Sequence, residues 1–249
     1  MNYETIDYSD IENKYRNLER YIEQMAQGKV RSLIVNGPPG VGKTYSATTY
    51  IEQYSIQKHK SITGHMTLFS LYGELYRHKA AGQILVLDDI DSVMDKVQGL
   101  NILKAAMDTT KQRIISWEST SAMLNAHCLP TSFEFNGGVI LITNSGFGSG
   151  KQKHIEHLNA LKDRSFCLSL GDKAQETIFK YICYVTLDKD ILKEYELTVE
   201  QKFEILKFIE EHMHTMHNLS IRSLVKCAEL MNIDCGNWKE LAVNGLVKI

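Results

Sequence analysis

A glycine-rich stretch near the N-terminus has the residue types and spacing of a phosphate-binding loop, G-x-x-x-x-G-K-[ST]. The stretch consists of Gly37, Pro38, Pro39, Gly40, Val41, Gly42, Lys43 and Thr44. Glycines allow successive backbone N–H groups to turn toward phosphate oxygens, and the helix expected to begin near Lys43 adds its positive N-terminal end. Lys43 is expected to reach the β- and γ-phosphates, and the Thr44 hydroxyl to ligand Mg²⁺. The pattern therefore predicts a nucleotide site.

A pair of acids follows a short apolar run 44 residues after this loop. Residues 84–87 are Ile-Leu-Val-Leu, and Asp88 and Asp89 come next. A phosphate-loop fold places its second Mg²⁺ contact at the end of such a strand, so Asp88 is expected to hold the ion through water. Asp89 is expected to orient or deprotonate the attacking water. The alternative is that these carboxylates cap the next helix, a role that suits Asp91.

The residues around these motifs indicate an α/β core and a helical C-terminal part. Short, two-sided apolar runs that alternate with helical patterns predict a parallel sheet covered on both faces. An amphipathic helix is expected over 8–27, and a helix over 91–110. The apolar runs are 32–36, 62–68, 84–87, 139–143 and 166–170, and the C-terminal helical patterns are 173–187, 199–216, 221–233 and 237–245.

These patterns predict three domains. They are an N-terminal helix over 1–28, an α/β nucleotide-binding core over 29–171 and a helical lid over 172–249. Thr198 with Gln201 predicts a capping box at the second lid helix, and Ser220 suits the N-cap of the third.

The composition excludes a broad basic face. The 249 residues include 28 Lys and Arg against 30 Asp and Glu, a net charge of −2. The five cysteines contain no C-x-x-C pair, which favours a reducing compartment. The N-terminus has no signal-peptide pattern, and no apolar run approaches the roughly 18 residues that would span a bilayer. We therefore expect a soluble, cytoplasmic protein with no membrane partner.

Taken together, the two motifs, the five strands and the helical tail resemble an AAA+ ATPase over roughly residues 28 to 235. In that family the strand that ends in Thr143-Asn144 carries sensor 1, so the resemblance implies that Asn144 positions the water. It also implies that Arg164 is an arginine finger and Arg222 a sensor 2 arginine from the lid. The alternatives are a strand-end turn for Asn144 and surface cations for the two arginines.

The resemblance implies ATP and Mg²⁺ as cofactors, bound between core and lid, and hydrolysis to ADP and phosphate. Because an arginine finger serves a neighbouring subunit, it also implies a homo-oligomer, commonly a six-membered ring. One position departs from the family. AAA+ enzymes usually carry Asp-Glu where this chain has Asp88-Asp89, and the shorter side chain predicts slow hydrolysis or a different water geometry.

Two features bear on the substrate. Residues 70–74, Ser-Leu-Tyr-Gly-Glu, resemble the aromatic pore loop of AAA+ rings, so Tyr72 is a candidate pore residue. The helical spacing of the neighbouring leucines predicts a buried Tyr72 instead. Between residues 113 and 138, two alternating runs around a loop predict a β-hairpin. Lys111 and Arg113, with Lys151 and Lys153, are candidates for a basic patch, or else solvated loop cations.

The sequence around this hairpin, Phe-x-Phe-x-Gly leading into Ile-Thr-Asn, looks like stand-alone AAA+ ATPases encoded by bacteriophages. We therefore expect a ring-forming motor or loader that acts on nucleic acid in phage-like DNA replication or packaging, within a host cell. The alternative is a protein-remodelling ATPase that threads or dismantles a protein partner, with an adaptor protein as a further partner. A nucleotide switch that hydrolyses ATP poorly is a third alternative.

Overall fold

A computed structural model of the chain describes residues 3–117, 122–144, 152–171 and 174–248. These residues group into two compact units. The sheet unit comprises Lys14–Asn36 and Lys43–Ser169, and the helical unit comprises Met1–Asn13, Gly37–Gly42 and Leu170–Ile249. The first helix is thus divided between the units, and the glycine-rich loop groups with the helical unit. This grouping cuts across the three predicted domains, whose boundaries stay a prediction.

The sheet unit is built on five parallel strands in the order β2-β3-β6-β1-β7. The strands are β1 (Ser32–Asn36), β2 (His59–Thr63), β3 (Ile84–Asp88), β6 (Gly138–Thr143) and β7 (Phe166–Ser169). The three central strands are apolar on both sides because helices cover both faces of the sheet. The predicted five-stranded parallel sheet is confirmed.

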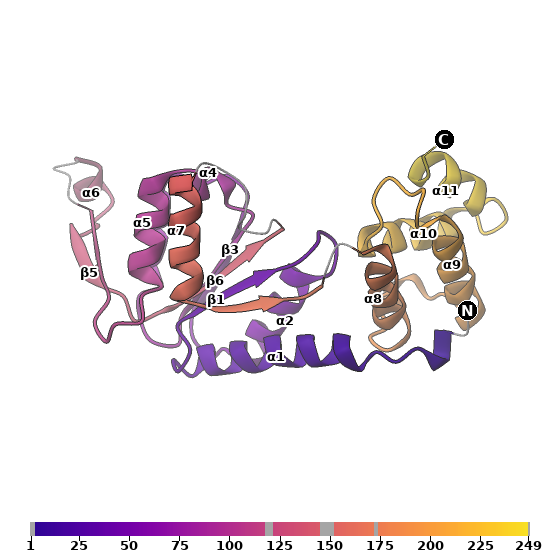
Figure 1. The fold of residues 1–249 in the computed structure, drawn as a ribbon, viewed down its shortest axis with the longest axis horizontal. Helices are drawn as coiled ribbons and strands as arrows, with labels where there is room; N and C mark the ends of the chain where they lie inside the picture. The colour runs from indigo at the N-terminus through magenta and orange to yellow at the C-terminus, as the bar shows by residue number, and fades with distance from the viewer. Residues whose placement is uncertain (1–2, 118–121, 145–151, 172–173, 249) are drawn as a thin grey trace. The chain divides into compact units, whose positions relative to one another are not determined.

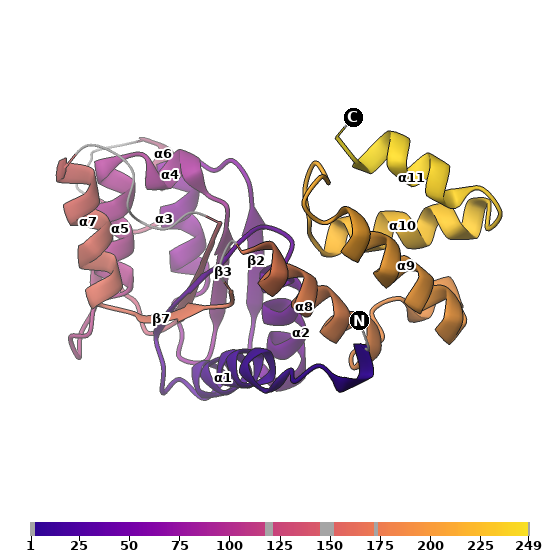
Figure 2. The same ribbon diagram turned by 45° about the vertical axis from the view of Figure 1, so that its right-hand side comes forward.

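Helices pack on both sides of this sheet. Figure 1 shows α5 and α7 on one side and α1 and α2 on the other, and in Figure 2 α3 lies in the layer of α5 and α7. The helices are α1 (Ser9–Ala26), α2 (Lys43–Tyr54), α3 (Leu68–Arg77), α4 (Asp91–Met94), α5 (Val97–Ala106) and α7 (Gln152–Asp163). A buried cluster between the sheet and the α3–α5 layer includes Leu71, Leu85, Leu103 and Leu141.

Two predicted elements of the sheet unit have different bounds in the structure. The second strand is 59–63 rather than 62–68, because Thr67 accepts a hydrogen bond from Ser70 N and caps α3 at Leu68. The predicted helix 91–110 is two helices, α4 and α5. A Cβ on Gly99 would lie 2.3 Å from the Val93 carbonyl oxygen, so the close approach of α5 to α4 requires glycine there.

The predicted hairpin is confirmed. Strands β4 (Ile114–Ser116) and β5 (Ser132–Glu134) pair antiparallel, and the short helix α6 (Ala122–Ala126) lies between them in sequence. The aromatic rings of Trp117 and Phe133 pack against Tyr72 of α3, at 5.6 and 5.2 Å between ring centroids. The hairpin is therefore anchored on α3.

The helical unit contains the four predicted C-terminal helices. They are α8 (Gln175–Leu187), α9 (Val199–His212), α10 (Ile221–Ile233) and α11 (Trp238–Leu246), with short 3-10 turns η1 (Tyr3–Thr5) and η2 (Lys193–Tyr195). The capping box of Thr198 and Gln201 is present, as predicted. Trp238 is 1% exposed and packs edge-on against Phe208 at 5.1 Å. Burial of these large apolar side chains stabilises the unit.

The N-terminus belongs to the same unit. The Tyr3 hydroxyl donates to Glu210 Oε2 at 2.6 Å, and Asp10 pairs with Lys180 at 2.7 Å. All five cysteines are free thiols. Within the described ranges, no helix combines the length and apolar character needed to cross a membrane.

Candidate nucleotide site

Strand ends bring Asp88 and Asn144 together at the carboxyl ends of the parallel strands. Asp88 ends β3, and Asn144 follows β6, which pairs with β3. The Thr44 hydroxyl, in the first turn of α2, donates to Asp88 Oδ2 at 2.5 Å. Hydroxyl and carboxylate oxygens are ligands that suit Mg²⁺. The pair therefore fits the ion that the sequence predicts.

A second set of contacts centres on Asn144. The Lys43 ammonium donates to Asn144 Oδ1 at 2.7 Å. The Asn144 amide donates to both carboxylate oxygens of Asp89, at 2.8 and 2.7 Å. The structure thus joins a cation, an amide and a carboxylate from three elements in one chain of hydrogen bonds. These are the types of group that can position phosphate and water.

The backbone at Asp89 has an unusual conformation. Its φ is +50°, and its N–H donates to the Ile142 carbonyl oxygen at 3.3 Å. Asp is among the few non-glycine residues that adopt this left-handed region with modest strain. The left-handed turn thus offers a physical reason for aspartate, rather than the family's usual glutamate, at this position.

In the helical unit, the glycine-rich loop lies against the N-terminus of α10. The Ile221 N–H donates to the Gly40 carbonyl oxygen at 2.9 Å. Gly40 has a φ of +76°, and a Cβ at this residue would lie 2.2 Å from the Cβ of Ser220. Glycine is therefore required at Gly40 both by the backbone turn and by this close approach.

The sequence does not predict this contact. It indicates Ser220 only as a helix N-cap, and Gly40 and Ser220 lie 180 positions apart with no local pattern that joins them. The contact bears on Arg222, which is exposed in the first turn of α10, two residues after Ser220. The helical unit therefore holds Arg222 in the turn that contacts the loop.

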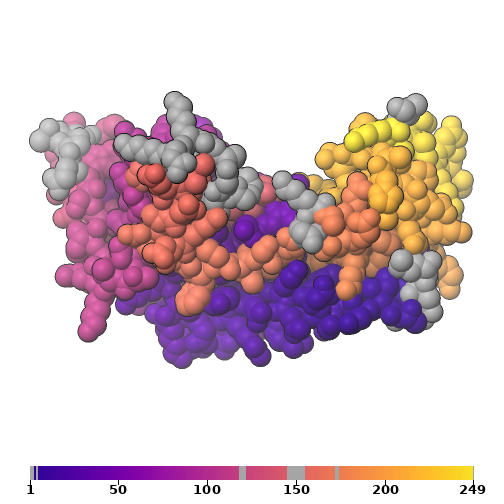
Figure 3. All heavy atoms as spheres, in the orientation of Figure 1, coloured from indigo at the N-terminus to yellow at the C-terminus, as the bar shows by residue number. Residues whose placement is uncertain are grey.

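Arg164 lies at the amino ends of the parallel strands, whereas Asp88 and Asn144 lie at their carboxyl ends. Its carbonyl oxygen accepts a hydrogen bond from Ser32, the first residue of β1, at 2.9 Å. Its guanidinium donates to the Ala160 carbonyl oxygen and lies 3.5 Å from an Asp108 carboxylate oxygen. About a third of the side chain is exposed, and α7 and β7, which flank Arg164, lie on the viewer's side in Figure 3. Arg164 is therefore not part of the site that Asp88, Asp89 and Asn144 form in its own chain.

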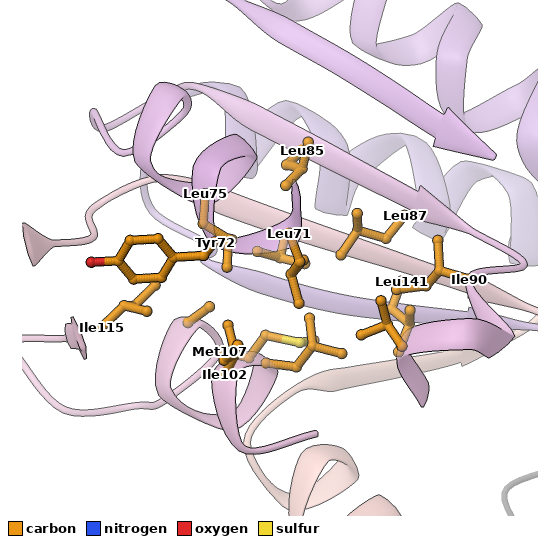
Figure 4. Close-up of a cluster of buried hydrophobic side chains, with 14 of the residues drawn as sticks. Leu71, Tyr72, Leu75, Leu85, Leu87, Ile90, Ile102, Met107, Ile115 and Leu141 are labelled. Atoms are coloured by element: carbon orange, nitrogen blue, oxygen red, sulfur yellow. The ribbon is translucent and has the colours of Figure 1, made fainter. Parts of the chain in front are cut away.

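The pore prediction for Tyr72 is wrong. The residue is fully buried, and its hydroxyl donates to the Pro130 carbonyl oxygen at 2.8 Å. Figure 4 shows the ring beside Ile115 at the end of the apolar cluster. The alternative prediction of a buried Tyr72, which rests on the helical spacing of the neighbouring leucines, is confirmed.

Arg113 is not a surface cation either, so its assignment to a basic patch is wrong. It is 1% exposed, and its guanidinium donates to the carbonyl oxygens of Ala106 and Gly137 at 2.5 and 2.9 Å. Burial, together with the nearby Arg31 charge, lowers the pKa of Arg113 to about 10. The side chain ties the hairpin base to the end of α5. Lys111 is exposed, whereas Lys151 and the Lys153 side chain lie outside the described residues.

Comparisons with known proteins agree with this geometry. The model of the family "ATPase family associated with various cellular activities (AAA)" matches residues 33–146. An uncharacterized 36.7 kDa protein from the nrdC-mobD intergenic region of Enterobacteria phage T4 is 27% identical, over 97% of this chain and 79% of the relative.

Two solved structures show the same fold. The Thermotoga maritima RuvB Holliday junction branch migration motor has a TM-score of 0.51 at 14% identity, over 94% of this chain and 68% of that chain. A DNA replication initiation factor has a TM-score of 0.52 at 13% identity, over 96% of this chain and 66% of that chain. With the phosphate loop, the strand-end carboxylates and the parallel sheet in place, residues 33–146 match the AAA family model, and the chain has the P-loop NTPase fold of the AAA+ structures and is similar to a phage-encoded protein.

Proposed function

We propose that the chain is a Mg²⁺-dependent ATPase that works as a ring on nucleic acid. The observation that carries the ATPase assignment is the pair of contacts at the carboxyl edge of the sheet. Thr44 meets Asp88, and Lys43 is linked through Asn144 to Asp89. A structural role alone gives no reason to place a lysine, a hydroxyl, an amide and two carboxylates at one edge.

Each residue has a distinct role in this proposal. Lys43 exchanges the Asn144 oxygen for phosphate oxygens, and the backbone N–H groups of residues 37–42 donate to the phosphates. Thr44 and Asp88 hold Mg²⁺, which when bound would neutralise phosphate charge. Once Lys43 has moved to phosphate, Asn144 and Asp89 share the task of orienting water, with Asp89 as the base. Arg222 contributes a cation from the loop-contacting turn of α10.

Ring assembly is supported by the place of Arg164. Within its own chain, the length of the sheet separates Arg164 from Asp88 and Asn144, so it does not reach the site formed by its own residues. The simplest alternative is that this arginine completes the site of a second copy of the chain. We therefore assign Arg164 to a neighbouring subunit's ATP site in a homo-oligomeric, six-membered ring of the kind the family forms.

Nucleic acid is the favoured substrate because two proteins with this fold are named for DNA transactions, one as a branch migration motor and the other as a replication initiation factor. The phage relative is consistent with a role in phage DNA replication or packaging. Lys111, which is exposed, is a candidate contact. The alternative, protein remodelling, rests partly on Tyr72 as a gripping residue, and the burial of Tyr72 removes that support.

The experiment that separates these substrates is the ATPase rate alone and with single-stranded DNA, double-stranded DNA or an unfolded protein. We expect stimulation by one form of DNA and none by unfolded protein. Lys43→Ala, which removes the phosphate-binding ammonium, is the control for contaminating ATPases. Stimulation by unfolded protein alone would contradict the nucleic-acid assignment and favour the remodelling function.

A further inference from the structure

The sheet unit carries a local concentration of positive charge that no motif explains. Between Glu52 and Asp88 the sequence has Lys58, Lys60, Arg77 and Lys79 but a single acid, Glu74. This stretch carries a charge of +3 without its histidines, whereas the whole chain carries −2. The remainder of the chain is therefore clearly acidic, and this stretch stands out as basic.

The fold gathers these four cations at one place. Lys58 and Lys60 lie at the start of β2, where the Lys58 carbonyl oxygen accepts from the Ile84 N–H at the start of β3. Helix α3 runs back along the sheet and ends at Arg77. The Lys60 ammonium and the Arg77 guanidinium contact the same oxygen of Glu74, at 2.8 and 3.0 Å. The start of the edge strand β2 and the C-terminal end of α3 thus share one surface at the amino ends of the strands.

The charge of this surface is only partly balanced. Glu74 is 7% exposed and is the shared partner of Lys60 and Arg77. Burial raises the pKa of Glu74, but the hydrogen bond and charge of Lys60, with Arg77, outweigh burial, so the pKa lies below its usual value. His78 beneath is fully buried, and burial lowers its pKa, so it adds no charge at neutral pH. All four cations are exposed, and Lys58 and Lys79 make no ion pair with the described part of the chain.

We propose that Lys58, Lys60, Arg77 and Lys79 form a phosphate-contacting surface that binds the sugar-phosphate backbone of nucleic acid without reading its sequence. Lysine is depleted at protein–protein interfaces, which usually have an apolar or aromatic centre. A regular row of phosphates needs no such centre, because neutralised phosphates release counterions. The surface rests on the proposed function, since it gives the place where the nucleic acid binds.

This surface is separate from the candidate ATP site. Asp88 ends the strand that begins beside Lys58, and four residue steps along β3 place the two edges about 13 Å apart. Lys58 and Lys79 can therefore be changed without touching the residues that meet at Asp88. Lys60 and Arg77 are better left in place, because removing them would leave the buried Glu74 carboxylate without its partners.

The test compares two double variants of the full chain. The surface variant is Lys58→Gln with Lys79→Gln, and the control is Lys193→Gln with Lys207→Gln, which removes two exposed lysines of the helical unit. Binding of a fluorescent single-stranded DNA of about 30 nucleotides is measured by anisotropy across a salt series. ATP affinity and the basal ATPase rate are measured in parallel.

We expect the surface variant to bind DNA about tenfold more weakly at low salt, with its log–log salt slope reduced by about 1.4, or about 0.7 for each phosphate that is no longer neutralised. The control should bind as the unchanged chain does, and all three should bind ATP equally. Equal DNA binding by the two variants would overturn the surface assignment while leaving a nucleic-acid function in place. No DNA binding by the unchanged chain would overturn both, and tighter binding to poly-glutamate than to DNA of equal charge would overturn the choice of partner.

Discussion

Asn144 is the residue on which the candidate site depends. Its amide oxygen accepts from Lys43, and its amide nitrogen donates to both oxygens of Asp89. An asparagine can serve both neighbours at once because its side chain carries an acceptor and two donors. The structure therefore holds the Asp89 carboxylate, the base in our proposal, in a defined place beside Asn144.

The first prediction separates the backbone of Asp89 from its carboxylate. Asp89→Gly removes the backbone strain at a φ of +50° but also the two hydrogen bonds from Asn144, so its free energy of unfolding should stay within about 1 kcal/mol of the unchanged chain's. Asp89→Asn should leave stability nearly unchanged, since asparagine also tolerates this conformation. Both variants should bind ATP and fail to hydrolyse it, which chemical denaturation and ATPase assays would show. Turnover at the original rate in Asp89→Asn would move the base elsewhere, with Asp91 the next candidate.

The second prediction concerns His78, which is buried at the end of α3. Its Nδ1 lies 2.9 Å from the Glu74 carbonyl oxygen, and burial, outweighing that hydrogen bond, lowers its pKa below the ordinary value of 6.5. The unfolded chain therefore binds a proton more readily than the folded one. His78 thus contributes stability above pH 6.5 that is lost as the pH falls toward the lower folded-state pKa.

Thermal unfolding at about pH 7.5 and about pH 5.5, on either side of the ordinary histidine pKa, checks this prediction. The fall in Tm between the two values should be smaller in His78→Asn, which keeps a donor near the Glu74 carbonyl oxygen but cannot be protonated. Carboxylates that titrate over the same range are common to both proteins and cancel in the comparison. An equal fall in Tm in both would show that His78 does not titrate differently in the folded state.

At the scale of elements, the glycine-rich loop and α10 form one structural feature. The loop's Gly40 carbonyl oxygen accepts from the first N–H of α10, and Ser220 lies against the space where a Cβ would be. The position of the loop is thus set by a helix that follows it by 180 residues. Any side chain at Gly40 must move either the loop or the helix.

The third prediction uses two glycines with positive φ. Gly40→Ala should weaken ATP binding at least about tenfold, because the new Cβ would overlap Ser220 and displace the loop. Gly64→Ala is the matched control, since Gly64 has a φ of +88° but nothing within 4 Å of its would-be Cβ. A fluorescent ATP analogue measures the affinity. Equal ATP affinity in the two variants would show that backbone strain at a positive φ, rather than contact with α10, is what requires glycine at residue 40.

The strands of the sheet show how far the sequence determines the fold. The strands 32–36, 84–87 and 139–143 are predictable within one residue because they are central and apolar on both faces. The second strand is misplaced because four of its five residues, His59 to Thr63, are polar, while the apolar residues after it belong to α3. The pattern of apolar residues is the main signal for a strand, and a strand of mainly polar residues carries little of it.

The site is predictable in part for a related reason. Lys43, Thr44 and Asp88 lie in short local patterns, so spacing alone identifies them. Helical spacing also predicts the burial of Tyr72, whereas the burial of Arg113 depends on how the hairpin base packs against the end of α5, which is a long-range property. The basic composition of residues 58–79 is visible in the sequence, but the meeting of its two halves, which are separated by 16 residues, depends on how α3 packs beside β2.

At the scale of the molecule, the proposed active site requires more than one chain. Arg164 lies at the amino ends of the strands, and Asp88 with Asn144 lies at their carboxyl ends, so a site that uses both must take them from two copies of the chain. This arrangement gives the fourth prediction. Mixing Arg164→Ala subunits with Lys43→Ala subunits should restore part of the ATPase activity that each lacks alone. Lack of recovery in mixed oligomers of confirmed size would place Arg164 outside the catalytic machinery.

The most direct test of the ATPase assignment is the rate of ATP turnover by the purified chain with Mg²⁺. The same rate is measured for the Lys43→Ala and Asp89→Asn variants, prepared in the same way. We expect hydrolysis by the unchanged chain, no ATP binding by Lys43→Ala, and ATP binding without turnover by Asp89→Asn. Wild-type affinity for ATP in Lys43→Ala, or turnover that is the same in all three proteins, would contradict the assignment of this site.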